Sequence, residues 1–492
     1  MIRRIVCISA LGAYSLVAAA TLPEAAKRQD RAAITAALQS GAEVNAAEPD
    51  GTTALHWAAY QDDRELARLL LDKGAKVGAK NRYGVTPLTL ACTSGSPEMV
   101  KLLLDAGADP NTVLAGGETA LMTASRAGMT GAVKLLLAKG ADVHAKEARL
   151  GQTAIMWAAA EGHADTVEAL VKGGADFRAR VESGFNAFLF AAREGRMDVV
   201  KVLLAAGADV NDTIQRSGTN KRASQGRQWP AIGTSALLLT ATNAHFDLGA
   251  YLLEKGANPN NLEAGITPLH MVSHVRKPGG GDNDPSPIGS GRMTSIEFVK
   301  KLKEHGADLN ARMTKKVQLG MTGINTLGAT PFFMAAKTAD AELMRTLAKL
   351  GADPSIPNAD NSTPLMAAAG LGTRSPGEDA GTEKEVKEAI EVALELGNDI
   401  NAVDKNGETA MHGAAYKNAP GAVLLLAEKG ADSKVWNQPN RHGWSPLTIA
   451  QGYRFGNYKP SLVTVEAFQQ VFQKAGIKPV EVPNPANRSP YN

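Results

Sequence analysis

The sequence predicts an all-α repeat solenoid built from short helix pairs, and three observations support this prediction. A Gly-Ala-Asp-like triplet recurs along the 492-residue chain, and a Thr-Pro-Leu-His-like motif keeps step with it. Such self-similarity at a fixed period is typical of repeat architectures. Aromatic residues make up only 5% of the chain, while Ala and Gly are abundant. This composition suits closely stacked helices better than a wide sandwich or barrel.

The glycines of the triplet set the period of the repeat. They are Gly41, Gly74, Gly107, Gly140, Gly174, Gly207, Gly256, Gly306, Gly351, Gly397 and Gly430. Successive spacings are 33, 33, 33, 34, 33, 49, 50, 45, 46 and 33 residues. The repeat unit is therefore 33 residues long, and the four longer spacings are consecutive.

Each part of the unit has a physical role. A Thr such as Thr53 caps a helix through its side-chain oxygen, and Ala or Pro follows at the first helical position. We expect a short helix over residues 55–60 and a second over residues 65–73, with leucines along one face of the second. Gly74 then ends the second helix, where a left-handed residue is needed.

A 33-residue turn–helix–helix unit with these two signatures resembles the ankyrin repeat family, and the resemblance covers residues 22–453. It implies an ankyrin helix-turn-helix stack that is curved and quasi-one-dimensional, with short β-hairpin fingers along one edge. It also implies that the His of the motif, at His56, His270 and His412, serves an inter-repeat hydrogen-bond network.

The N-terminus is typical of a targeting segment. Positive charge at Arg3 and Arg4 precedes an apolar run over residues 5–17, and small residues follow over residues 18–20. The run is too short for a stable membrane anchor, and no other apolar run approaches membrane length. We therefore expect an exported protein, periplasmic or extracellular, with no transmembrane segment after signal removal. Cys92 would then be the one remaining thiol, so no intrachain disulfide is expected.

The pattern also predicts a domain organisation. We expect a signal peptide over residues 1–20, an N-terminal capping repeat over 21–49, regular ankyrin repeats over 50–211, ankyrin repeats with four insertions over 212–405, final ankyrin repeats over 406–453, a C-terminal capping helix over 454–478 and a disordered tail over 479–492.

Four insertions account for the long spacings. Two lie where the family has its fingers, at residues 212–232 and 313–327, and two lie between paired helices, at residues 275–294 and 371–384. Insertions in solenoids often line the binding edge, although long surface loops also cost little stability. Since stacked helices pack about 8–10 Å apart, the two finger insertions should lie roughly 20 Å apart. A small ligand could touch both only if the loops fold inwards.

Motifs for chemistry are mostly missing. The chain has no G-x-S-x-G, H-E-x-x-H, Walker A or C-x-x-C pattern. His270 and His274 have metal-ligand spacing, but His270 occupies the family's structural His position. We therefore expect no catalytic residue, no cofactor and no metal. The net charge of +3 does not by itself favour a polyanionic partner.

These observations favour a non-catalytic protein–protein interaction scaffold that binds through its concave face and inserted loops, and we expect a monomer. In the family, residues just after the Ala-Ala pair of the first helix face the groove, and Arg, Tyr and Trp often dominate interface energy. The candidate partner-binding residues are Tyr60, Arg126, Arg193, Arg222, Arg227, Trp229, Lys337 and Tyr416. Of these, Arg222, Arg227 and Trp229 belong to a basic loop.

Two alternatives stay open. The insertions could form a ligand or polyanion site in an accessory or enzyme-like protein, or the chain could be an exported effector directed at a host. The basic loop could bind nucleic acid or anionic glycans, but an exported protein seldom meets DNA, so the expected partner is a protein.

Overall fold

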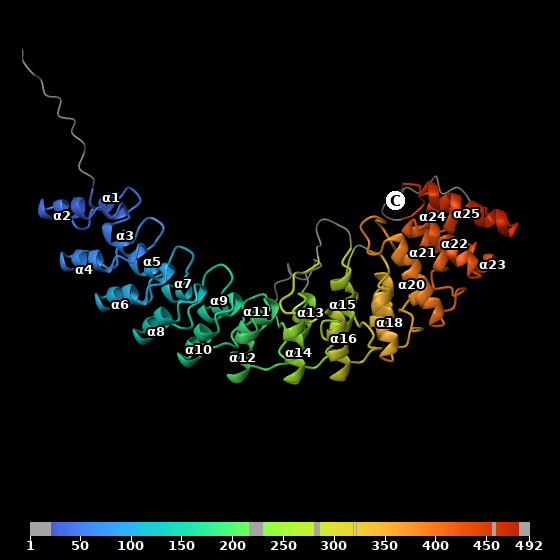
Figure 1. The fold of residues 1–492 in the computed structure, drawn as a ribbon, viewed down its shortest axis with the longest axis horizontal. Coiled ribbons are helices and arrows are strands. Elements are labelled where there is room, and N and C mark those ends of the chain that lie inside the picture. Colours follow the sequence, from blue (N-terminus) through green and yellow to red (C-terminus); the bar gives the residue numbers. More distant parts are fainter. Residues whose placement is uncertain are drawn as a thin grey trace, which may run out of the picture. The chain divides into compact units, whose positions relative to one another are not determined.

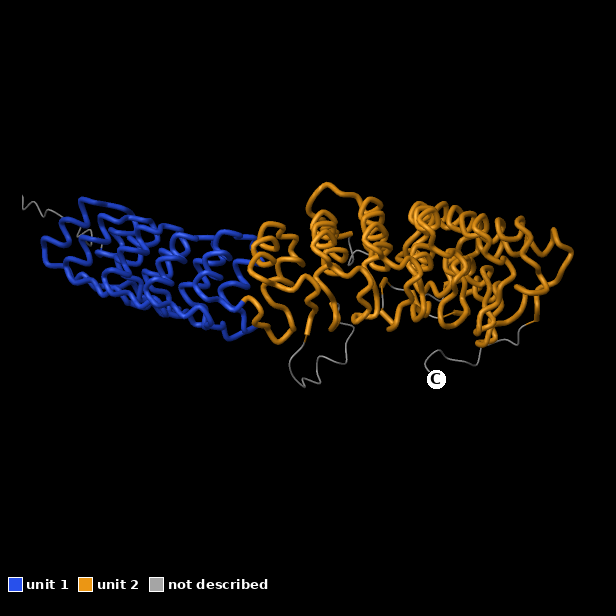
Figure 2. Tube along the Cα trace, turned by 90° about the horizontal axis from the view of Figure 1, so that it is seen from below, with its two compact units in different colours: residues 1–176 blue, residues 177–492 orange. Residues whose placement is uncertain are grey.

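The computed structural model describes residues 21–215, 230–279, 286–317, 319–320, 322–454 and 459–481. The chain divides into two compact units, Met1–Asp176 (unit 1) and Phe177–Asn492 (unit 2), which Figure 2 colours separately. Each unit is a stack of antiparallel helix pairs, as Figure 1 shows. The expected signal peptide over residues 1–20 and most of the expected tail lie outside the described residues.

Unit 1 contains the pairs of the regular 33-residue repeat. Its helices are α1 (Leu22–Lys27), α2 (Arg31–Gln39), α3 (Ala54–Tyr60), α4 (Arg64–Asp72), α5 (Pro87–Ser94), α6 (Pro97–Asp105), α7 (Ala120–Arg126), α8 (Thr130–Ala138), α9 (Ala154–Glu161) and α10 (Ala164–Lys172). The first helix of each pair packs on the first helix of the next, in the order α1, α3, α5, α7, α9. The second helices α4, α6, α8 and α10 form the other row.

Unit 2 repeats this arrangement with longer connections. Its first helices are α11 (Ala187–Arg193), α13 (Ala236–Thr242), α15 (Pro268–Arg276), α17 (Pro331–Lys337), α19 (Pro364–Ala368), α21 (Ala410–Lys417) and α24 (Pro446–Ala450), and each packs on the next. The second helices are α12 (Met197–Ala205), α14 (Phe246–Glu254), α16 (Ser295–Glu304), α18 (Ala341–Lys349), α20 (Glu383–Glu395), α22 (Pro420–Glu428) and α25 (Leu462–Ala475), with the short α23 (Ser433–Trp436) between α22 and α24. The predicted all-α repeat solenoid is confirmed.

Local chemistry explains the helix boundaries. Thr86 lies in extended backbone before α5, and its side chain accepts a hydrogen bond from the backbone N–H of Thr89. Gly74 and Gly107 follow second helices with φ near 90°, and a Cβ at either would meet no atom within 4 Å. These glycines are therefore required by their left-handed backbone and not by crowding.

Two of the three motif histidines, His56 and His270, link neighbouring repeats as the family resemblance implied, whereas among the described residues His412 bonds only to Thr409 of its own repeat. The backbone N–H of Thr53 donates to Nδ1 of His56 over 3.1 Å, so Nε2 carries the proton and donates to the Val85 carbonyl over 3.1 Å. His270 makes the same two bonds, to Thr267 and to the Ala329 carbonyl. Burial lowers the pKa of His270 to about 4, so its ring is neutral. Both ring nitrogens are thus engaged within the fold.

The short fingers that the family resemblance implied carry little β-pairing. Within the described residues their pairing consists of isolated antiparallel bridges, Ala47 to Thr53, Val113 to Thr119 and Thr213 to Ser235. At the C-terminal end, Trp436 is buried against Phe468 and Phe472 of α25, with ring centroids 5.9 and 5.6 Å apart. These ring contacts join α23 to α25, and the expected capping role of residues 454–478 stays a prediction.

Candidate functional site

The two candidate residues of unit 1 lie on its surface but differ in their surroundings. Tyr60 is 55% exposed, and its ring meets the edge of Trp57 at a centroid distance of 6.1 Å. The guanidinium of Arg126 lies 4.8 Å from the ring centroid of Trp157 and 3.0 Å from the Glu118 carboxylate. Arg126 is therefore a positioned cation, because an aromatic face and a carboxylate fix its direction.

Arg193 of unit 2 is held in a similar way. Its guanidinium lies 5.2 and 5.1 Å from the ring centroids of Phe185 and Phe190, and its Nε is 2.7 Å from the Glu194 carboxylate. Three further candidates belong to the segment between α12 and α13, and they lie outside the described residues: Arg222, Arg227 and Trp229.

Lys337 and Tyr416 are not on an open concave surface. Tyr416 is only 5% exposed, and its hydroxyl donates to the Glu408 carboxylate over 2.9 Å. The Nζ of Lys337 donates to the Leu319 carbonyl over 2.7 Å. Burial lowers the pKa of Lys337 to about 8. The physical reason is that inserted loops, which a regular repeat lacks, cover this part of the face.

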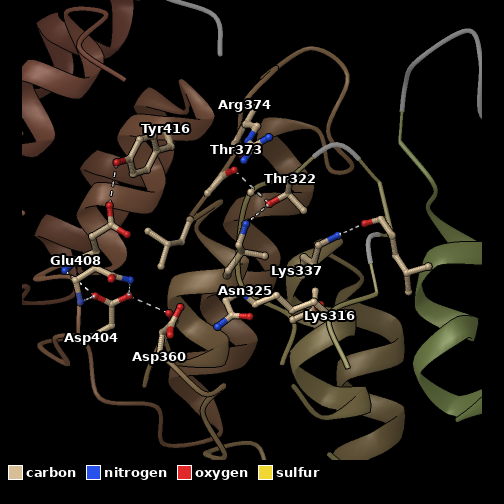
Figure 3. Close-up of a pocket in the computed structure, with 18 of the residues that line it drawn as sticks. Lys316, Thr322, Asn325, Lys337, Asp360, Thr373, Arg374, Asp404, Glu408 and Tyr416 are labelled. Atoms are coloured by element: carbon tan, nitrogen blue, oxygen red, sulfur yellow. Dashed lines mark hydrogen bonds between the residues drawn. The ribbon is translucent and has the colours of Figure 1, made fainter. Parts of the chain in front are cut away.

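Both residues line a cavity of about 630 Å³ in unit 2. Figure 3 shows its walls. One wall consists of finger residues from successive repeats, Asn325, Asp360, Ser362, Asp404, Asn406, Glu408, Arg441 and His442. The facing wall comes from inserted loops and the ends of first helices, and includes Lys316, Leu319, Thr322, Lys337, Leu371, Thr373, Arg374 and Tyr416.

Direct hydrogen bonds join two of the inserted loops that line this cavity. The backbone N–H of Gly323, in the insertion 313–327, donates to the Gly372 carbonyl of the insertion 371–384 over 2.7 Å. Thr322 adds a side-chain bond to the same carbonyl over 3.3 Å. Ala231, at the end of the insertion 212–232, also lines the cavity. The loops therefore fold inwards, which is the condition under which a small ligand can touch both finger insertions.

The insertion 275–294 also forms ion pairs and hydrogen bonds with neighbouring repeats of unit 2. Arg276 binds the Asp340 carboxylate with two nitrogens, at 2.5 and 3.1 Å, and Asp340 is only 1% exposed at its side chain. Lys277 lies 2.7 Å from the Glu385 carboxylate and donates to the Ala339 carbonyl over 3.1 Å. Lys277 holds the pKa of Glu385 down, to about 2. Charged groups thus connect this insertion to α18 and α20 of the two following repeats.

A second charged group lies beside the cavity. Lys417 donates from Nζ to the carbonyls of Asp379 and Ala380, over 2.9 and 2.7 Å. Burial lowers the pKa of Lys417 and raises that of Asp379. The Lys417 amine thus holds the backbone of the insertion 371–384. Together with Lys337, these residues line a small adjoining pocket.

The sequence indicated only part of this site. It singled out Lys337, Tyr416 and the insertions, but it missed Asp360, Asp404, Glu408, Lys316 and Arg374. A partial signal for the acids was present, because all three lie in or beside the finger turns Asn-Ala-Asp-Asn and Asp-Lys-Asn-Gly, although at different positions of those turns. The contact between two insertions about 50 residues apart left no pattern in the sequence.

The described residues show neither a metal cluster nor a spanning helix. No three His, Cys, Asp or Glu side chains among them are grouped so that they could hold a metal ion. Within the same ranges, no helix is long and apolar enough to cross a membrane.

Comparison with known proteins supports the repeat assignment. Residues 22–114 and 121–214 match the family model described as ankyrin repeats in three copies. An ankyrin repeat protein of fowlpox virus is 32% identical over 88 residues, which is 18% of this chain and 19% of that protein. The human SH3 and multiple ankyrin repeat domains protein 2 is 32% identical over 230 residues, or 42% of this chain and 11% of that protein.

A third relative carries the name of an enzyme. The E3 ubiquitin-protein ligase KEG of Arabidopsis thaliana is 26% identical over 244 residues, which is 42% of this chain and 14% of the ligase. The chain thus spans less than a fifth of each of these relatives. Ankyrin repeats are shown over residues 22–214, and the helix pairs of unit 2 continue the same fold.

Proposed function

We propose that the chain is a non-catalytic protein–protein interaction scaffold, exported across the cytoplasmic membrane, that binds a partner through its concave face and inserted loops. Ankyrin repeats are interaction modules in general, and Arg126 and Arg193 present positioned guanidinium groups of the kind that anchor protein interfaces. The observation that carries the proposal is the convergence of inserted loops over first-helix ends, where Gly323 bonds to Gly372. Loops that bond to one another hold a defined surface, which a partner can recognise.

The partner surface is tested by affinity capture from the cell envelope with matched variants. The first variant combines Arg126→Ala and Arg193→Ala, and the second replaces residues 216–229 with a short turn that keeps the Thr213–Ser235 bridge. The control combines Arg68→Ala and Lys134→Ala, two exposed positions on second helices. A specific partner should be captured by wild type and control and be reduced at least about tenfold by either test variant. A partner captured equally by all four proteins contradicts this surface.

Export is tested separately. The charged and apolar N-terminal segment supports a mature chain that begins at or near Thr21. N-terminal sequencing of the protein from an extracytoplasmic fraction should show that start. Intact Met1 on a cytoplasmic protein contradicts the export proposal and leaves the binding surface unaffected.

A second candidate function is a ligand site formed by the insertions. The cavity of about 630 Å³ favours it, since small-molecule sites commonly measure about 300–1,000 Å³. A scaffold that only docks folded proteins needs no cavity of this size.

A further inference from the structure

The cavity of unit 2 has walls of opposite charge. Figure 3 shows Asp360, Asp404 and Glu408 on one side, and Lys316, Lys337 and Arg374 across from them. Within the described residues, no ion pair joins any of the three carboxylates to any of the three cations. Opposite charges that face each other across a space without pairing are suited to a ligand that carries both signs.

The acidic wall is fixed by its own hydrogen bonds. The Asp404 carboxylate accepts from the backbone N–H groups of Asn406 and Glu408, over 2.7 and 2.9 Å, and from the Ser362 hydroxyl over 2.9 Å. Glu408 accepts from Tyr416 and from Asn440, both over 2.9 Å. These bonds satisfy the carboxylates as acceptors and hold them in place.

Asp360 is the free acid of this wall. Its backbone N–H donates to Asn358, but its carboxylate has no hydrogen-bond or ionic partner among the described residues. The cation on the same wall, Arg441, has its Nε 3.2 Å from Nε2 of His442. Asp360 is therefore the carboxylate best able to receive an ammonium group.

The basic wall comes from three separate segments. Lys316 belongs to the insertion 313–327, Lys337 ends α17, and Arg374 belongs to the insertion 371–384. Lys316 and Arg374 are exposed and have no carboxylate partner in the described part of the chain. A guanidinium binds a carboxylate through two parallel hydrogen bonds, which makes Arg374 the natural anchor for an anionic end group.

The middle of the cavity offers polar groups of the kind that bind amides. Asn325 accepts from the backbone N–H of Leu327 through Oδ1, over 3.1 Å, which leaves its side-chain NH₂ as a donor. Asn406 and Thr373 also line the space. A peptide carries amide carbonyls and N–H groups between two charged ends, so its chemistry matches the two walls and the middle together.

We propose that this cavity binds a short peptide with two free ends, whose ammonium group meets Asp360 and whose carboxylate meets Arg374 and Lys316. A polyanion would be repelled by the three carboxylates, and a polyamine would be repelled by the three cations. The proposal rests on the proposed function, because it refines how the insertion-bearing repeats bind. It names the class of partner that the enclosed part of that surface accepts.

The ligand class is tested with the full-length protein and chemically matched probes. The first probe is an equimolar mixture of tripeptides with free ends, and the others carry an acetylated N-terminus, an amidated C-terminus or both. Inorganic polyphosphate and spermidine serve as single-sign probes. Ligand-observed NMR should show binding of free-ended peptides, and mass spectrometry should identify the peptides that stay bound to the protein. Blocking either end of the peptide should weaken binding by about tenfold or more.

Variants assign the two ends. Arg374→Gln should weaken binding of free-ended peptides but leave C-amidated peptides unchanged, because that interaction is already missing. Asp360→Asn should do the same for N-acetylated peptides. Lys300→Gln on α16 and Glu254→Gln on α14 are exposed controls that should change nothing.

Three outcomes overturn the proposal: retention of no peptide, equal binding of free and doubly blocked peptides, or tighter binding of polyphosphate than of any peptide. These outcomes leave the proposed function intact if a protein partner is still captured through Arg126 and Arg193. Loss of that capture alone would instead remove the scaffold surface and leave the peptide site standing.

Discussion

The regular repeats of unit 1 and the inserted repeats of unit 2 use the same helix pair to make different surfaces. In unit 1 the connections are short, and the residue after the Ala-Ala pair of α3, Tyr60, is 55% exposed. In unit 2 the corresponding residue of α21, Tyr416, is 5% exposed and forms part of a cavity wall. The comparison shows that longer, mutually bonded loops cover a face that short connections leave open, while the helix pair keeps the same arrangement.

The largest expected difference between the two units is in local stability, and it concerns two arginines that form matching ion pairs. Arg31 and Arg276 each bind an Asp that caps a second helix of the following repeat, Asp63 at α4 and Asp340 at α18. The Arg31 side chain is 55% exposed, whereas that of Arg276 is 16% exposed. Removing one partner of a buried ion pair leaves an uncompensated charge and costs about 3–5 kcal/mol, while exposed pairs contribute about 0–1 kcal/mol.

We therefore expect Arg276→Gln to lower local stability around α18 by several kcal/mol and Arg31→Gln to have little effect around α4. Hydrogen exchange of peptides from the two helices measures each effect locally, which suits a repeat protein whose segments open separately. Equal loss of protection in both variants would mean that burial does not distinguish the two regions.

The second expected difference is a pH dependence that only the covered face should show. Burial lowers the pKa of Lys337 to about 8, whereas an unfolded lysine titrates near 10.4. Between these values the unfolded state binds more protons, so stability contributed by this site rises as pH rises from about 8 to 10. The penalty of the charged, buried amine is fully present at pH 7.

Lys337→Met should therefore raise the free energy of unfolding at pH 7, by at most about 3 kcal/mol, and flatten its rise toward pH 10. Lost bonding to the Leu319 carbonyl reduces the gain. The exposed Lys134→Met serves as the control and should change neither quantity. Urea unfolding at several pH values measures both variants, and parallel pH profiles for wild type and Lys337→Met would contradict the assignment.

The sequence predicted the parts of the molecule that repeat and missed the parts that depend on distant contacts. Gly74 and Thr53 belong to local turns, so their roles follow from neighbouring residues. The inward folding of residues 313–327 depends on a bond to Gly372, about 50 positions away. For that reason Lys337 was expected on an open face, while Asp360 and Arg374 were not expected at a site at all.

Two glycines should differ for the same reason. Gly74 has φ +87° with open space around its Cβ position, so Gly74→Ala meets only backbone strain of about 1–2 kcal/mol. Gly372 has φ +79°, and a Cβ there would lie 2.5 Å from the Ile324 backbone nitrogen. Gly372→Ala should cost more, roughly 2–3 kcal/mol, because the two insertions must also move apart.

Hydrogen exchange and peptide binding should be measured for both variants, Gly74→Ala and Gly372→Ala. Gly74→Ala should leave binding at the cavity unchanged, whereas Gly372→Ala should weaken both binding and the protection of residues 322–327. Normal binding by Gly372→Ala would show that contact between the insertions does not shape the cavity.

The smallest expected difference is between the two tyrosine hydroxyls. The Tyr416 hydroxyl donates to Glu408 over 2.9 Å, and burial raises the pKa of that carboxyl. Tyr416→Phe removes one donor from the half-buried Glu408 carboxylate and one acceptor from Asn440, which should cost about 0.5–1.5 kcal/mol, with Asn440 still bonded to Glu408 over 2.9 Å. Tyr60→Phe removes an exposed hydroxyl and should cost close to nothing. Because the ring and its packing stay in place in both variants, the difference between their urea midpoints isolates the hydroxyl. Equal midpoints would mean that the Tyr416 hydroxyl gains nothing from its half-buried partner, and that covering this face adds enclosure but no bonding.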